Sequence, residues 1–130
     1  MVYTSDHGED IFDDERERFL HASPTPTCWQ LHVPMIVWMS DSYRNEHPCK
    51  YASAQAHADS QVSSSRSVFS TLISLGNITT PAYDAAASLV DSTYTEPVRL
   101  YVNDYNEGIT LGRAGLRHPD YTRLDSLDIR

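Results

Sequence analysis

The apolar residues of this chain are grouped in short segments whose spacing predicts strands and helices in alternation. Residues 1–5 are β-prone and lead into a polar turn at Gly8, which predicts a strand that ends in a loop. Residues 33–38 form an almost continuous apolar run, as in a strand that is covered on both faces within a parallel sheet. Pro34 is expected at the start of that strand.

The middle of the chain carries helical patterns. Asp41 offers an N-cap and Pro48 interrupts the segment that follows, so we expect two short helices before residue 61. A serine cluster at 63–65 then precedes an apolar stripe at helical spacing, which predicts a longer helix that ends at Gly76. The stripe consists of Val68, Phe69, Leu72, Ile73 and Leu75.

The remaining segments are more polar. Residues 9–27 are acidic and then proline-rich, which predicts an irregular surface loop with at most one helical turn. Residues 98–102 are typical of a further strand, and a hairpin is expected around 107–111. Residues 113–130 lack periodicity and are predicted to form a poorly ordered polar tail after a domain at 1–112.

This order of elements predicts part of a layered α/β domain with a mostly parallel sheet. The chain supplies few strands, so the sheet is expected to be incomplete and to leave edges open. Pairing of two copies through these edges, as a homodimer, is one alternative that the pattern allows.

Composition narrows the class of protein. The chain of 130 residues is 40% apolar and 22% charged, as in globular proteins, and no apolar run reaches the roughly 20 residues that span a bilayer. The formal net charge of −8 argues against a nucleic-acid partner, because such binding depends on Lys and Arg. The acidic run within residues 9–17 is interpreted as a solvated loop rather than a rim that attracts cations.

The two cysteines leave two alternatives open. Cys28 and Cys49 match neither a zinc-knuckle spacing nor a redox motif. In an oxidising compartment a disulfide between them would contribute about 3 kcal/mol, but two unpaired thiols are equally compatible with the sequence.

Asp6 and His7 are the first candidates for chemistry, because they follow a predicted strand at its carboxyl end, where α/β sheets place ligands. A carboxylate and an imidazole are both good zinc ligands, and a turn at Gly8 would let them converge on one ion. The alternative is a solvent-exposed polar turn. His21 is either a site residue or a structural histidine, and His32 is interpreted as a hydrogen-bonding residue at a strand edge.

No residue is nominated as a nucleophile. The sequence contains no glycine-rich phosphate loop and no Gly-x-Ser-x-Gly motif, and none of its serines or threonines stands beside an evident activating base.

Three motifs in order carry a resemblance to a known family: Val-Tyr-Thr-Ser-Asp-His-Gly-Glu at 2–9, Phe-Leu-His at 19–21 and His-Val-Pro-Met-Ile-Val-Trp at 32–38. They resemble the bacterial phosphoethanolamine transferases, sulfatase-like enzymes of the alkaline phosphatase superfamily that act on lipid A and related glycans. Residues 67–78 resemble the helix that follows in sulfatase-like enzymes. The resemblance implies the C-terminal portion of such a catalytic domain.

By this resemblance Asp6 and His7 are ligands of a catalytic zinc, with one or two ions in the site. His21 would bind the transferred phosphoryl group or a second metal, or protonate the leaving oxygen, and would thus be catalytic. The family's threonine nucleophile lies upstream of residues 5–9, so the chain alone is expected to be inactive.

The implied reaction moves phosphoethanolamine from a phospholipid to lipid A or another glycan, on the periplasmic side of the bacterial inner membrane. That oxidising compartment would suit a bridge between Cys28 and Cys49. The alternatives are a segment of a hydrolytic sulfatase or phosphodiesterase, and a non-catalytic fragment.

Overall fold

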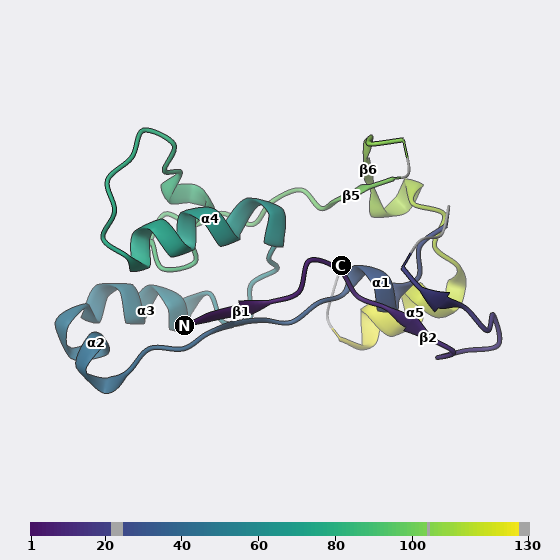
Figure 1. Ribbon diagram of the computed structural model, residues 1–130, viewed down its shortest axis with the longest axis horizontal. Helices are drawn as coiled ribbons and strands as arrows, with labels where there is room; N and C mark the ends of the chain where they lie inside the picture. The colour runs from purple at the N-terminus through teal and green to yellow at the C-terminus, as the bar shows by residue number, and fades with distance from the viewer. Residues whose placement is uncertain (22–24, 104, 128–130) are drawn as a thin grey trace. The chain divides into compact units, whose positions relative to one another are not determined.

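A computed structural model of the chain describes residues 1–21, 25–103 and 105–127. The chain divides into two compact units, one formed by residues 1–4 and 35–97 and the other by residues 5–34 and 98–130 (Figure 1). The boundary predicted at residue 112 does not separate these units, because residues on both sides of it belong to the second one.

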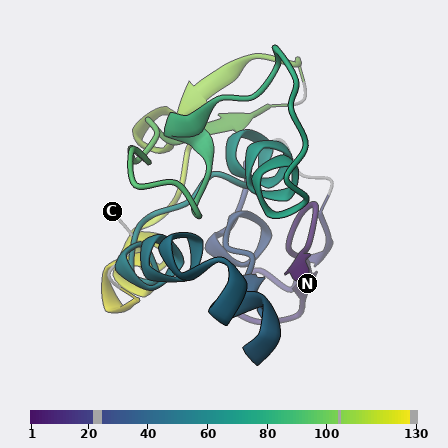
Figure 2. The same cartoon turned by 90° about the vertical axis from the view of Figure 1, so that its left-hand side faces the viewer.

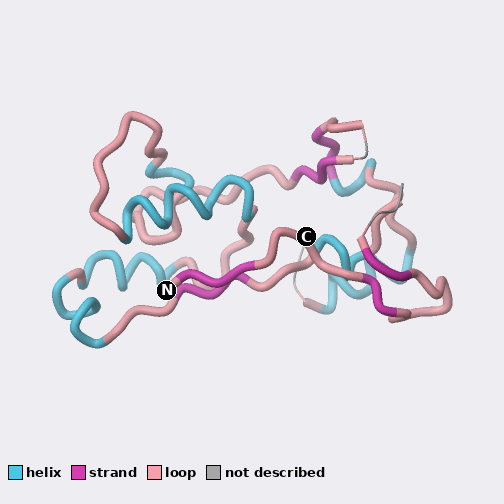
Figure 3. The backbone as a smooth tube through the Cα atoms, in the orientation of Figure 1, coloured by secondary structure: helices cyan, strands magenta, loops and turns pink. Residues whose placement is uncertain are grey.

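The first unit begins with β1 (Val2–Thr4), which pairs with β4 (Met35–Val37) in antiparallel register, Tyr3 opposite Ile36 (Figure 3). Both predicted strands are therefore confirmed, but the parallel sheet is not. Within the described residues the strands form three separate two-stranded sheets, and each pair is antiparallel. The face of this pair that carries Tyr3 and Ile36 is open, because these side chains are 55% and 50% exposed. The expectation that residues 33–38 are covered on both faces is wrong.

The helices of the first unit follow the sequence pattern closely. α2 (Asp41–Glu46) and α3 (Pro48–Ala56) are the two short helices expected, and Pro48 opens the second of them (Figure 2). Ser40, and not Asp41, caps α2, because its side chain accepts a hydrogen bond from the backbone of Tyr43. α4 (Ser64–Leu75) ends at Gly76 as predicted, and Asn77 adopts a left-handed φ of 55°.

The buried face of α4 differs from the predicted apolar stripe. Phe69 and Leu72 are exposed, whereas Ser67, Ser70 and Thr71 are buried. Their small size lets the segment around the 3₁₀ turn η1 (Ala85–Ala87) approach, and the hydroxyl oxygens of Ser70 and Thr71 accept backbone hydrogen bonds from that segment. The hydrophobic pattern of the sequence does not predict this contact, because hydroxyl groups make it.

The second unit contains two hairpins and two helices. The acidic segment forms the hairpin of β2 (Asp10–Ile11) and β3 (Phe19–Leu20), and β5 (Leu100–Val102) pairs with β6 (Gly108–Thr110) before the 3₁₀ turn η2 (Leu111–Arg113). The predicted strand at 98–102 is confirmed as β5, and the hairpin expected around 107–111 is formed by β5 with β6. The prediction of an irregular loop at 9–27 is wrong for residues 10–11 and 19–20, and residues 22–24 lie outside the described residues. No described helix is long and apolar enough to cross a bilayer.

The predicted polar tail also contains a helix. α5 (His118–Ser126) contacts α1 (Cys28–Leu31), and Leu124 joins Cys28, Ala114 and Leu116 in the core of the second unit. The expectation of a poorly ordered tail is therefore wrong for residues 118–126, and residues 128–130 lie outside the described residues. The hydrophobic periodicity of the sequence does not predict this helix, because Leu124 is the one apolar side chain that α5 buries among the described residues.

A buried ion pair ties the acidic hairpin to α5. Arg16 donates to both carboxylate oxygens of Asp120 at 2.7 and 2.8 Å, and Asp120 is completely buried. Asp120 also accepts hydrogen bonds from the backbone N–H groups of Cys28 and Arg117. The acidic run is thus only partly a solvated loop, since Arg16 within it anchors the fold.

Stability is expected to fall in acid through Asp120. Burial alone raises the pKa of this carboxyl, but the hydrogen bonds from Arg16 and from two backbone N–H groups outweigh burial and lower it from 3.8 to about 2. A carboxyl with a depressed folded-state pKa contributes stability above its unfolded pKa and loses it as the pH falls through the folded value. We expect a loss of about 2 kcal/mol between about pH 4 and pH 2.

Urea unfolding between pH 2 and pH 6 measures this loss, with an Asp120→Asn variant as the control. The variant should be less stable near neutral pH and should show a shallower pH dependence in this window. Equal slopes for the two proteins would show that Asp120 is not the group responsible.

Candidate metal site

The candidate site is built on the turn that follows β1 and on the end of the second strand of the acidic hairpin. Asp6, His7 and Glu9 lie on the turn, and His21 follows β3 directly. Asp10 pairs with Leu20 in the hairpin, so the same register places Glu9 across from His21. The hairpin thus joins two motifs that are separated in the sequence.

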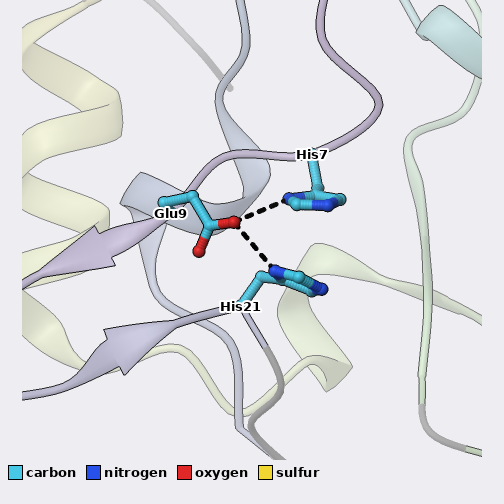
Figure 4. Close-up of side chains that lie close together, drawn as sticks. All are labelled: His7, Glu9 and His21. Atoms are coloured by element: carbon cyan, nitrogen blue, oxygen red, sulfur yellow. Dashed lines mark hydrogen bonds and ion pairs between the residues drawn. The ribbon is translucent and has the colours of Figure 1, made fainter.

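Three side chains converge at this point (Figure 4). One ligand atom from each of His7, Glu9 and His21 lies within 4.8 Å of the others. The Glu9 carboxylate is 2.9 Å from His21 Nδ1 and 3.6 Å from His7 Nδ1, and the two imidazole rings are 3.7 Å apart between centroids. Glu9, which belongs to the motif at 2–9 but was not predicted to be a ligand, is therefore at the centre of the cluster.

Asp6 lies on the other side of the His7 ring. Its carboxylate is 3.5 Å from His7 Nε2, and its side chain is 85% exposed. Hydrogen bonding to backbone N–H groups, first, and then the neighbouring His7 imidazole lower the pKa of the Asp6 carboxyl, which keeps it ionised near neutral pH. An ionised carboxylate is the form that coordinates a metal.

The geometry fits zinc on the Asp6 side of His7. Zinc bonds of about 2.0–2.1 Å place neighbouring ligand atoms about 3.3 Å apart in a tetrahedral site, close to the 3.5 Å between Asp6 and His7 Nε2. His7 Nδ1 lies 3.1 Å from the backbone carbonyl of Gly8, to which it can donate. Metal-binding histidines commonly donate their second ring N–H in this way, because it fixes the tautomer of the coordinating nitrogen.

His21 is oriented by Glu9. The 2.9 Å contact at Nδ1 lets His21 donate to the carboxylate, and Nε2 takes no part in this contact (Figure 4). The cluster therefore offers two alternative donor sets: Asp6 with His7 Nε2 when His7 Nδ1 carries the ring proton, and Glu9 with the Nδ1 atoms of His7 and His21 when these carry none.

Other residues that the sequence raised lie apart from this cluster. His32 is the C-cap residue of α1 and is exposed, and the partial desolvation of its imidazole, followed by the charges of Arg99 and Arg123, lowers the pKa of this group. His32 is not among the converging ligands of the described residues, and it lies at the end of α1 rather than at a strand edge.

The two cysteines are free thiols in the structure. Cys28 is buried and Cys49 is exposed. Burial and the nearby Asp120 carboxylate raise the pKa of the Cys28 thiol to about 11, so it is protonated and unreactive. The disulfide between them stays a prediction that the structure does not support.

Comparison with known proteins gives a consistent picture. The chain is 34% identical over 92 residues to the phosphoethanolamine transferase EptA of Salmonella typhimurium, and 26% identical over 121 residues to CptA of the same organism. These alignments cover 69% and 92% of this chain but only 16% and 20% of the relatives, so the chain spans a small part of their length. A third relative is the Kdo(2)-lipid A phosphoethanolamine 7''-transferase of Escherichia coli, 48% identical over 60 residues, covering 45% of this chain and 9% of the relative.

The fold agrees with these relatives. The crystal structure of the C-terminal periplasmic domain of EcEptC from Escherichia coli matches with a TM-score of 0.71 and 25% identity, over 92% of this chain and 33% of that one. The Sulfatase family model matches residues 1–78, which contain the candidate site and the helices of the first unit. With its sulfatase-like fold and its likeness to phosphoethanolamine transferases, the chain belongs to the Sulfatase family.

Proposed function

We propose that this chain is the C-terminal segment of a zinc-dependent phosphoethanolamine transferase, which moves phosphoethanolamine from a phospholipid to lipid A or another glycan. The observation that carries the proposal is the convergence of His7, Glu9 and His21 beside Asp6, in a chain whose relatives are named as such transferases. The membrane-anchored parent would act on the periplasmic side of the inner membrane, as the periplasmic structural relative suggests.

In this proposal Asp6 and His7 Nε2 hold the zinc. When bound, the ion would supply positive charge that activates a hydroxyl nucleophile and neutralises the phosphoryl oxygens. The nucleophile is proposed to be a threonine outside these 130 residues, together with the remaining ligands, so the isolated chain would not catalyse transfer. Catalytic zinc normally has three protein ligands, of which this side of the ring supplies two.

His21 is proposed to contact the transferred phosphoryl group. Glu9 accepts a hydrogen bond from His21 Nδ1 and fixes the direction of the ring. In its protonated form the ring carries a second N–H at Nε2, which would donate to a phosphoryl oxygen or give its proton to the leaving oxygen. The half-exposed position of His21 leaves room for such a substrate.

A transfer assay with the longest natural protein that contains this segment tests the proposal. Phosphatidylethanolamine and lipid A are the donor and acceptor, and His21→Ala is expected to lower transfer at least about 100-fold, the usual contribution of a general acid or base. His118→Ala, at an exposed position of α5, is the control and should retain activity. Full activity of His21→Ala would refute its role, and release of free phosphoethanolamine without transfer would favour a hydrolase.

A further inference from the structure

The site residues are carried by two backbone segments, and one residue contacts both. His7 and Glu9 flank Gly8 on the turn, whereas His21 follows the hairpin strand β3. Each strand of that hairpin is only two residues long, so its ladder alone fixes the two segments weakly. The residue that contacts both segments is Gln30, on α1.

The backbone of Gln30 holds the turn. Its carbonyl oxygen accepts a hydrogen bond of 2.9 Å from the N–H of Gly8, the residue between His7 and Glu9. This contact fixes the turn against α1 at the point where the two ligand side chains diverge.

The side chain of Gln30 holds the hairpin. Its amide nitrogen donates to the Asp10 carboxylate at 2.6 Å and to the backbone carbonyl of Leu20 at 3.1 Å, which uses both of its N–H groups. Asp10 follows Glu9 and Leu20 precedes His21. Gln30 and Asp10 are 6% and 3% exposed, so water competes little for these bonds.

We propose that Gln30 is the positioning residue that sets the distance between the turn that carries His7 and Glu9 and the hairpin segment that carries His21. Three of its hydrogen bonds join residues that neighbour His7, Glu9 and His21 in the chain. The inference rests on the proposed function, because this distance matters only if the side chains that it brings together bind a metal or the substrate. The Asp10 carboxylate is also bound by Thr27 at 2.8 Å, and this bond makes no contact with the His21 segment.

Two variants, each similar in size to the residue that it replaces, separate a positioning role of Gln30 from a contribution to stability alone. Gln30→Leu removes the connection between the two segments, whereas Thr27→Val removes a buried bond to the same Asp10 carboxylate and leaves the connection in place. Gln30→Asn covers the case in which Gln30→Leu does not fold, because its shorter amide cannot reach both acceptors. Each is made in the 130-residue chain.

Two readouts are followed in parallel. The first is the nuclear Overhauser effect between the ring protons of His7 and His21, because the centroids of these rings are 3.7 Å apart. This measurement needs no metal. The second is Co²⁺ titration by visible absorption. In Gln30→Leu we expect loss of the ring contact and Co²⁺ binding at least about tenfold weaker, as is usual when a residue that orients metal ligands is removed. Thr27→Val should retain both signals.

The contact between the His7 and His21 rings tests the positioning role of Gln30 whether or not the chain binds Co²⁺. If Gln30→Leu or Gln30→Asn retains it, or if Thr27→Val loses it equally, Gln30 is not the positioning residue. Failure of the unmodified chain to bind Co²⁺ would count against the proposed metal site instead, while a ring contact that disappears only in the Gln30 variants would still support the positioning role.

Discussion

Replacement of Gly8 by alanine is expected to destabilise the chain by about 3 kcal/mol and to abolish metal binding. A Cβ atom at this position would lie 1.8 Å from the backbone oxygen of Trp29 and 2.9 Å from its carbonyl carbon. Both atoms belong to the α1 backbone, so no side-chain rotation relieves the contact. The turn must move away from α1, which breaks the bond to Gln30 and displaces His7 and Glu9.

Urea unfolding and Co²⁺ titration of Gly8→Ala measure these two effects. Gly112→Ala is the matched control, because no atom lies within 4 Å of the added Cβ there. We expect the control to bind Co²⁺ as the unmodified chain does. Unchanged stability of Gly8→Ala would mean that the turn is not held against α1 as described.

Replacement of Arg16, which lies between β2 and β3, is expected to cause a large loss in the free energy of unfolding. Arg16→Met leaves the completely buried Asp120 carboxylate without its cationic partner, which typically costs about 3–5 kcal/mol. The reason is that the charge of Asp120 stays desolvated, and the backbone N–H groups of Cys28 and Arg117 that still donate to it carry no compensating charge. The free energy of unfolding in urea measures the effect.

Two further variants test whether this loss of stability arises from the unpaired Asp120 carboxylate. Arg113→Met removes an exposed arginine and should change stability by no more than about 0.5 kcal/mol. Arg16→Met combined with Asp120→Leu removes both charges and should recover part of the loss. An equal loss in the single and the double variant would contradict a cost that arises from the unpaired carboxylate.

Local signals predicted the parts of the fold that depend on neighbouring residues. The glycine after Asp6 and His7 indicated a turn, and Pro48 and Gly76 marked a helix start and a helix end that the structure confirms. The position of Asp6 and His7 after a strand is also confirmed, because β1 ends at Thr4. Their metal-binding role stays a proposal.

The parts that were missed depend on contacts between distant residues. The burial of Asp120 requires Arg16, 104 residues earlier, so α5 was interpreted as a tail. The acidic hairpin did leave a signal that could have been used: apolar pairs at 11–12 and 19–20 flank its charged tip, and the rings of Phe12 and Phe19 stack at 5.4 Å. Pairing Ile11 with Phe19, the register that the structure has, would have placed Glu9 opposite His21 and identified the third member of the cluster.

The sheet was mispredicted for a different reason. An apolar run such as residues 33–38 indicates burial but not the direction of its partner strand. In this chain the available partner is β1, which pairs antiparallel and leaves one face of β4 open.

Zinc titration by isothermal calorimetry tests the central claim most directly. The unmodified chain is compared with an Asp6→Ala, His7→Ala double variant, and with His118→Ala as a control outside the site. We predict saturable binding that the double variant loses and the control retains. Binding that is absent from the unmodified chain, or equal in the double variant, would contradict the assignment of Asp6 and His7 as ligands of the metal.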